Sequence, residues 1–240
     1  MMVQKMMDIN CDLGEGLDND NQLMPLLDSC NISCGGHAGD EFSIRKSIRM
    51  AKKNLVKIGA HPSYPDRENF GRKKLVIPFS DLKGSIMAQL KLFENICKEE
   101  QAIFHHIKPH GALYNEAAID PEIAGLLIQV MSNFPGVNLY VPPNSVIERL
   151  ALENNVPIIT EAFADRSYHS NLTLVSRSHP KALLTDPKEV LDHVKQMMLY
   201  GKVKTIEGEL VPIKAETLCI HGDNPSAVEI LKTIRVNLNI

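Results

Sequence analysis

Residues 29–62, SCNISCGGHAGDEFSIRKSIRMAKKNLVKIGAHP, contain a complete strand, loop, helix and second strand. Short apolar runs at Ser29–Ser33 and Lys57–Ala60 predict two β-strands. Between them, Phe42–Lys53 places apolar side chains along one stripe and Arg and Lys side chains on the opposite face, which predicts an amphipathic helix. Two strands joined by a helix are typical of a parallel sheet, so this stretch predicts an α/β fold.

The same alternation of short apolar runs and amphipathic stretches extends along the whole chain. The predicted strands are Met7–Asn10, Ser29–Ser33, Lys57–Ala60, His106–Lys108, Asn138–Val141, Ile158–Ala162 and Leu218–His221. The predicted helices are Phe42–Lys53, Ser80–Lys98, Pro121–Asn133, Asn144–Asn154, Pro187–Met198 and Ser226–Leu238. Seven strands with intervening helices favour a distorted seven-stranded (β/α) TIM-like barrel over an open doubly wound sheet. Because no linker interrupts the pattern, we expect a single domain over residues 1–240.

The composition limits the classes of partner. The 240 residues are 44% hydrophobic and 23% charged, with a formal net charge of -3, so no basic excess favours nucleic acid. No signal peptide and no 18-residue apolar run are found, so we expect a cytoplasmic protein that has no membrane partner. The five cysteines form no CxxC pair, which predicts reduced thiols.

The segments that directly follow the predicted strands are dense in Gly, Pro, His and charge. They are DLGEG (12–16), CGGHAGD (34–40), HPSYPDRENFGR (61–72), PHGALYN (109–115), FADRSY (163–168) and HGDNP (221–225). In parallel α/β folds, ligands bind in the loops at the carboxyl ends of the strands. Six such loops on one rim therefore predict the functional site there.

Titratable side chains concentrate at these strand ends. Alternation along the first strand predicts that Asp8, Asn10 and Asp12 point the same way, toward the barrel axis. Lys108 and His110 are spaced alike on the fourth strand and could partner buried acids, which need compensation. A polar barrel interior that serves only stability is the alternative interpretation.

Three chemistries fit these groups. Metal-assisted hydrolysis would use nitrogen and oxygen ligands from different strands, namely Asp12, His37, His61 and His110. General acid–base catalysis would use an Asp or His as base and Lys108 or Arg166 to stabilise an oxyanion. Thiol catalysis would use Cys11, Cys34 or Cys219 beside a histidine.

The glycine-rich loop raises a separate possibility. Neither GxxxxGK[ST] nor GxGxxG occurs, so no nucleotide fingerprint is present. Gly35, Gly36 and Gly39 nevertheless precede the helix at Phe42, whose first amides could hold an anion. A tight turn that needs positive φ explains the same glycines equally well.

A series of motifs along nearly the whole chain resembles the LamB/YcsF family. In order, they are DINCDLGEG, CGGHAGD, IGAHPSYPD, FGR, IKPHGALYN, EAFADRSY, LVSR and CIHGDNPSAV. The resemblance implies a seven-stranded, distorted barrel like that of the glycoside hydrolase/deacetylase superfamily. It also implies ATP-dependent ring opening of 5-oxo-L-proline (pyroglutamate) to L-glutamate, as the A component of a 5-oxoprolinase that also needs the separately encoded 5-oxoprolinase subunits B and C. ATP would be a co-substrate of the complex, accompanied by Mg²⁺.

The resemblance also selects site residues. We expect catalytic roles for Asp12, His37, His61, Lys108, His110 and Glu161, with Asp12 or Glu161 as the base that directs water onto an O-phosphorylated lactam. We expect substrate binding by Asn10, Glu15, Asn115, Asp165, Arg166, His221 and Asp223. If a metal binds in the barrel, the candidate ligands are Asp12, His37 and His61.

Two positions depart from the family pattern. Gly36 stands where a larger apolar residue, often Phe, is usual, and Ser63 stands where Gly is usual. We expect the glycine at position 36 to loosen the pocket wall beside His37. Two other functions stay open at this point: a metal-dependent N-acyl or polysaccharide deacetylase, and a protein that binds a small carboxylate without turnover.

Overall fold

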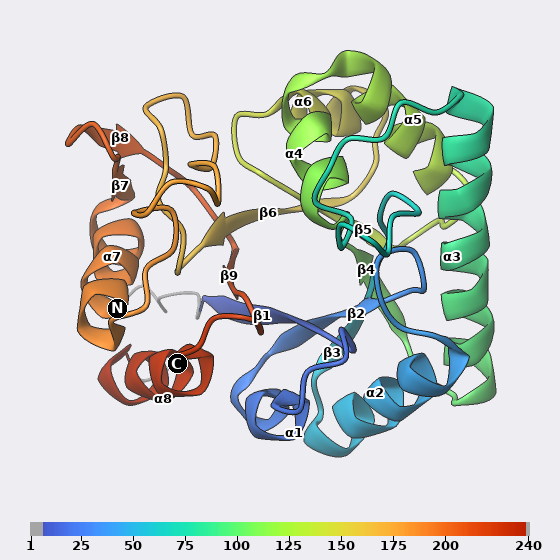
Figure 1. Cartoon of the computed structure of the whole chain (residues 1–240), viewed down its shortest axis with the longest axis horizontal. Helices are drawn as coiled ribbons and strands as arrows, with labels where there is room; N and C mark the ends of the chain where they lie inside the picture. Colours follow the sequence, from blue (N-terminus) through green and yellow to red (C-terminus); the bar gives the residue numbers. More distant parts are fainter. Residues whose placement is uncertain (1–6, 239–240) are drawn as a thin grey trace.

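A computed structural model describes residues 7–238, and the strands form a closed parallel barrel in the order β1-β2-β3-β4-β5-β6-β9 (Figure 1). The strands are β1 (Asp8–Leu13), β2 (Ser29–Ser33), β3 (Lys57–His61), β4 (Phe104–Ile107), β5 (Asn138–Val141), β6 (Ile158–Phe163) and β9 (Thr217–Ile220). The predicted fold class, a seven-stranded (β/α) barrel, is confirmed. Residues 1–6 and 239–240 of the expected domain lie outside the described residues.

Helices surround the barrel. They are α1 (Asp20–Leu23), α2 (Glu41–Asn54), α3 (Phe79–Glu99), α4 (Gly111–Ile119), α5 (Pro121–Met131), α6 (Val146–Glu153), α7 (Pro187–Tyr200) and α8 (Ala227–Leu238), with a 3-10 turn, η1 (Met24–Leu26). In Figure 1, α2 and α3 cover one side, α7 and α8 the opposite side, and α4 to α6 the top. None of the helices described within residues 7–238 has the length and apolar character needed to cross a bilayer.

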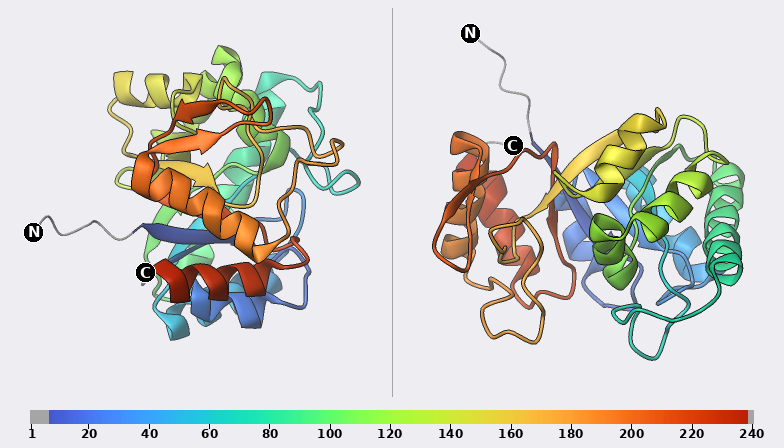
Figure 2. Two further views of the ribbon diagram at one scale, coloured as in Figure 1. Left: turned by 90° about the vertical axis from the view of Figure 1, so that its left-hand side faces the viewer. Right: turned by 90° about the horizontal axis from the view of Figure 1, so that it is seen from above.

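The structure corrects three details of the sequence prediction. Only Pro109 and His110 of PHGALYN lie in a loop, because α4 begins at Gly111, after the short connection 108–110 that follows β4. The first strand extends to Leu13, so Asp12 lies within β1 and not in the loop that follows it. An antiparallel hairpin, β7 (Lys202–Lys204) and β8 (Leu210–Pro212), lies outside the barrel next to α7 (Figure 2). The chain that forms this hairpin belongs to the excursion between β6 and β9, which pair with each other and close the barrel.

The inside of the barrel is polar. Asn10 and Asp12 of β1 both accept from the amide of Asn31 on β2, at 2.7 and 2.8 Å, while Asp8 accepts from the hydroxyls of Ser29 and Thr217. The predicted common orientation of the three β1 side chains is therefore confirmed. The alternate β1 residues, including Ile9 and Cys11, point away from the barrel interior and are buried in the hydrophobic core around the barrel. All five cysteines are free and buried.

Candidate active site

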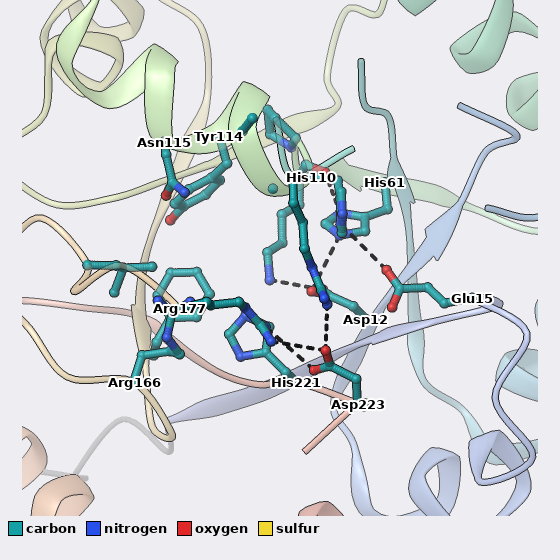
Figure 3. Close-up of a pocket in the computed structure, with 18 of the residues that line it drawn as sticks. Asp12, Glu15, His61, His110, Tyr114, Asn115, Arg166, Arg177, His221 and Asp223 are labelled. Carbon is teal, nitrogen blue, oxygen red and sulfur yellow. Dashed lines mark hydrogen bonds and ion pairs between the residues drawn. The ribbon is translucent and has the colours of Figure 1, made fainter. Parts of the chain in front are cut away.

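A cavity of about 360 Å³ opens at the carboxyl ends of the strands (Figure 3). The loops after β1, β3, β4, β6 and β9 contribute to it, as do the first residues of α4. Its ionisable lining residues include Asp12, Glu15, His61, Arg72, Lys108, His110, Arg166, Arg177, His221 and Asp223. The site therefore lies on the rim that the sequence indicated.

Lys108 lies at the floor of this cavity and is 2% exposed. Its Nζ is 3.0 Å from Asp12 Oδ1, 3.0 Å from Glu161 Oε1 and 2.9 Å from Cys219 Sγ. Burial opposes a charged ammonium, but the carboxylates of Asp12 and Glu161 outweigh it and raise the pKa of Lys108 well above its ordinary value. Burial likewise opposes ionisation of Asp12, but His61 and Lys108 hold the pKa of that carboxyl well below its usual range. The floor is thus an ion pair of Lys108 with Asp12.

A histidine cluster, which we define as Glu15, His37, His61 and His110, forms the wall beside Asp12. His37 Nε2 is 2.9 Å from Glu15 Oε1, and His110 Nδ1 is 2.9 Å from His61 Nε2. The rings of His37 and His110 stack with centroids 3.6 Å apart. One ligand atom from each of the four residues lies within 4.8 Å of the others, so the cluster could hold a metal ion.

Backbone carbonyls orient two of the rings. His61 Nδ1 is 2.7 Å from the carbonyl oxygen of Lys108, and His110 Nε2 is 2.9 Å from that of Phe70. A carbonyl oxygen only accepts, so each of these nitrogens carries the proton. The loop carrying Phe70 approaches closely because Gly71 adopts φ +62°, where an added Cβ would lie 3.0 Å from both His110 and His37.

Two arginines meet one carboxylate at the mouth of the cavity. Arg72, from the loop after β3, and Arg177, from the loop after β6, both bond to Asp223 after β9, with Arg177 Nη1 3.0 Å from Oδ2. We call these three residues the arginine clamp, and Figure 3 shows the contact between Asp223 and Arg177. Burial alone would raise the pKa of Asp223, but Arg177, His221 and Arg72 lower it, so the carboxylate is ionised.

Arg166 and Asp165 organise the neighbouring loop. Arg166 donates to the carbonyl oxygens of Ala182 and Val175, at 3.1 and 2.6 Å. Burial, followed by the charge of Arg177, lowers the pKa of Arg166 to about 10, which leaves it a cation near neutral pH. Asp165 Oδ1 is 2.8 Å from His221 Nδ1 and so fixes that ring against the cavity.

The structure brings most of the predicted site residues into one place. Those that line the cavity are Asp12, Glu15, His61, Lys108, His110, Asn115, Arg166, His221 and Asp223. Four others lie behind the lining: Asn10 and Glu161 within the barrel, His37 behind His110, and Asp165 beneath His221. These four contact lining residues and so position them.

Sequence reasoning missed several residues of the cavity. Arg72 and Arg177 end the FGR and LVSR motifs, but the motifs alone did not assign them to the site. Tyr114 and Phe163 also line the cavity. An arginine at the end of each of two rim motifs was the available signal.

The structure argues against two of the sequence expectations, the anion site before Phe42 and catalysis by a cysteine thiol. The anion site before Phe42 is occupied, because the Asp40 carboxylate accepts from the Ser43 amide in a capping box. Burial raises the pKa of Cys11, Cys34 and Cys219, so these thiols stay protonated and are poor nucleophiles.

The expectation that Gly36 loosens the pocket wall beside His37 is wrong. A Cβ at position 36 would lie 2.4 Å from Ser63 Oγ and 2.5 Å from Gln89 Oε1, so those two side chains already fill the space. Gly36 and Ser63, which are both expected to depart from the family pattern, therefore face each other.

The chain is similar to several curated proteins over nearly its full length. It is 43% identical over 231 residues to the A component of 5-oxoprolinase from Haemophilus influenzae (strain PittEE), covering 96% of this chain and 94% of that protein. It is 43% identical over 235 residues to the corresponding component from Histophilus somni (strain 129Pt), covering 98% and 95%.

The chain is also similar to a solved structure over nearly the full length of both chains. The lactam utilization protein of Thermus thermophilus superposes with a TM-score of 0.90 at 35% identity, covering 97% of this chain and 96% of that one. The family model for LamB/YcsF matches residues 7–240. The barrel, the rim motifs and these matches together show that the chain belongs to the LamB/YcsF family.

Proposed function

We propose that this chain is the A component of an ATP-dependent 5-oxoprolinase and that its cavity is where the lactam ring of 5-oxo-L-proline is opened to L-glutamate. The names of the relatives support this substrate. The observation that carries the proposal is the buried, charged Lys108 at the cavity floor, 3.0 Å from the ionised Asp12. A fixed cation beside a carboxylate suits the attack of water on a carbonyl, because the cation stabilises the developing oxyanion.

The geometry favours Asp12 over Glu161 as the base. Asp12 lines the cavity, and its Oδ1 is fixed by Asn31 and Lys108 while Oδ2 lies 3.3 Å from His61 Nε2. Glu161 does not line this cavity, and its Oε1 accepts from Asn10 and pairs with Lys108. We assign Asp12 to the activation of water and Glu161 to holding Lys108.

The cationic mouth suits the carboxylate of 5-oxoproline. Arg72, Arg166 and Arg177 line the cavity, and Arg166 stays protonated near neutral pH. Guanidinium groups bind carboxylates through paired hydrogen bonds. We therefore expect the substrate carboxylate at the arginines and the lactam carbonyl toward Lys108, with His221 and Asn115 beside the ring.

ATP would activate the lactam by phosphorylating its oxygen, which makes the ring carbon more electrophilic and releases ADP. Water would then add to that carbon, the C–N bond would break with the nitrogen leaving as a protonated amine, and a second water would hydrolyse the resulting γ-glutamyl phosphate to L-glutamate and inorganic phosphate. We expect ATP and its Mg²⁺ to act in a cytoplasmic complex with 5-oxoprolinase subunits B and C. The Asp40 cap argues against a phosphate site at the start of α2.

The test is glutamate release from 5-oxoproline by the purified chain mixed with subunits B and C. We expect activity only when all three proteins and ATP are present, and a loss of about 100-fold or more in kcat for Asp12→Asn and Lys108→Met. Lys57→Met is the matched control, because Lys57 pairs with Asp8 at the opposite end of the barrel.

Activity of Asp12→Asn equal to wild type would exclude Asp12 as the base. Release of acetate from N-acetyl sugars or N-acyl amino acids without ATP would instead support the deacetylase alternative, for which the histidine cluster is the favourable observation.

A further inference from the structure

The histidine cluster contains more hydrogen-bond acceptors than it has protons to donate to them. His61 and His110 each donate one ring proton to a backbone carbonyl, at 2.7 and 2.9 Å. In the neutral rings, His61 Nε2 and His110 Nδ1 are therefore both acceptors, yet they lie 2.9 Å apart. Two lone pairs at that distance repel unless a cation lies between them.

Further acceptors surround the same point. Glu15 Oε1 is 3.5 Å from His110 Nδ1, and Asp12 Oδ2 is 3.3 Å from His61 Nε2. Glu15 Oε1 is also 2.9 Å from His37 Nε2. One proton could satisfy a single pair among these atoms, whereas a divalent cation interacts with all of them at once.

We propose that Glu15, His37, His61 and His110 form a binding site for one divalent transition-metal ion, and that zinc is its best-fitting occupant. Three imidazoles and one carboxylate are a ligand set that zinc prefers, while Mg²⁺ prefers oxygen atoms alone. Zinc-to-nitrogen bonds of about 2.0–2.1 Å place tetrahedral ligand atoms roughly 3.3 Å apart. The separations of 2.9 to 3.5 Å among paired ligand atoms bracket this value, and the wider separations in the cluster, up to 4.8 Å, must shorten when the ion binds.

The ligand side chains of the proposed site are held by outer hydrogen bonds of the kind found at metal sites. The carbonyl oxygens of Lys108 and Phe70 fix the tautomer and the orientation of His61 and His110, as outer hydrogen bonds do at metal sites. Figure 3 shows Glu15, His61 and His110 converging beside Asp12 at the cavity. An ion held there would adjoin the space proposed for the lactam carbonyl and could polarise a carbonyl oxygen.

The test is zinc binding by the purified full-length chain alone. The chain is stripped with a chelator and dialysed, then titrated with Zn²⁺ by calorimetry, and bound metal is counted by mass spectrometry. We expect about one zinc ion per chain. His110→Ala should weaken binding roughly 100-fold, and the milder Glu15→Gln roughly 10-fold. His221→Ala is the matched control, since it removes an imidazole of the same cavity that is bound to Asp165 and lies outside the cluster.

A wild-type chain that binds no zinc would overturn the proposal, as would equal weakening by His110→Ala and His221→Ala. If His110→Ala does not fold, as judged by circular dichroism, the visible absorption of the Co²⁺-loaded wild type decides. Intense bands of four-coordinate Co²⁺ that zinc displaces support the site, and the weak spectrum of octahedral Co²⁺ refutes it. Neither ATP nor a partner protein is present, so the outcome is independent of the proposed lactam chemistry.

Discussion

A single ammonium group sets the charge of the barrel interior. Lys108 compensates Asp12 on β1 and Glu161 on β6, the two strands that flank β9 in the barrel. Asn10 links the same groups through its donation to Glu161 at 2.9 Å. Such a network is satisfied only as a whole, because removing one partner leaves a buried charge without compensation.

Lys108→Met should therefore destabilise the fold as well as the activity. We expect a loss of about 3–5 kcal/mol in the free energy of unfolding at pH 7, measured by urea denaturation. Because the pKa of Asp12 is lowered in the folded chain, its contribution is present above about pH 3.9 and is lost as the pH falls below that value. Lys57→Met, which removes a partly exposed ion pair, should cost at most about 1 kcal/mol. A similar small loss for Lys108→Met would contradict this account.

Gly36→Ala tests the packing beside His37. The added Cβ would meet Ser63 Oγ and Gln89 Oε1, and the Gln89 amide is held by hydrogen bonds to the Ser63 backbone. We expect a loss of about 1–3 kcal/mol in stability, typical of overpacking. Gly84→Ala in α3, where nothing lies within 4 Å of the new Cβ, should instead stabilise by about 0.5–1 kcal/mol. Equal midpoints of denaturation for the two variants would rule out the clash.

At the level of elements, strands were easier to predict than the segments between them. β2 and β5 match their predicted bounds, because each is a short, fully or mostly buried segment between loop signals. α4 was missed since it packs against both α5 and α6, so it carries no polar stripe to mark it as a helix. β7 and β8 are three residues each and lie outside the barrel, too short for an alternating pattern.

The buried ring of His193, in α7, should make the stability of the folded chain depend on pH in the acidic range. Burial lowers the pKa of His193 to about 4, so the folded chain keeps the ring neutral where the unfolded chain, with a pKa of about 6.5, takes up a proton. Stability should therefore fall as the pH drops from about 6.5 to 4, by about 3 kcal/mol from this group. Urea denaturation across that range measures the slope, and His193→Gln should reduce it. An unchanged slope in the variant would show that other groups cause the acid response.

Across the whole molecule, the cavity is assembled from loops that are far apart in sequence. The sequence identified the rim and nine of the residues that line the cavity, because ionisable and polar residues directly follow the strands. It did not identify the arginine clamp, since only the folded loops show that Arg72 and Arg177 share Asp223. It also did not separate lining residues from those behind them, such as Asn10 and Asp165, because strand register decides that depth.

Asp223→Asn should loosen these loops without unfolding the barrel. The clamp is partly exposed, so we expect less than about 1 kcal/mol of change in global stability. Amide hydrogen exchange should become faster in residues 62–72 and 164–186, and KM for 5-oxoproline should rise. Unchanged exchange in both loops would show that the clamp does not hold them.

The direct pairing of β6 with β9 has a consequence for how this architecture can diversify. Residues 164–216 lie outside the strand circuit, yet part of this excursion supplies Arg166 and Arg177 to the cavity. Mutations there can alter which molecules enter while every hydrogen bond between neighbouring barrel strands is preserved. Part of the excursion, including α7, packs in the core, whereas residues 176–181, which include Arg177, are exposed. This exposed stretch is therefore where evolution, or a designer introducing a new substrate preference, can change the cavity with little risk to folding.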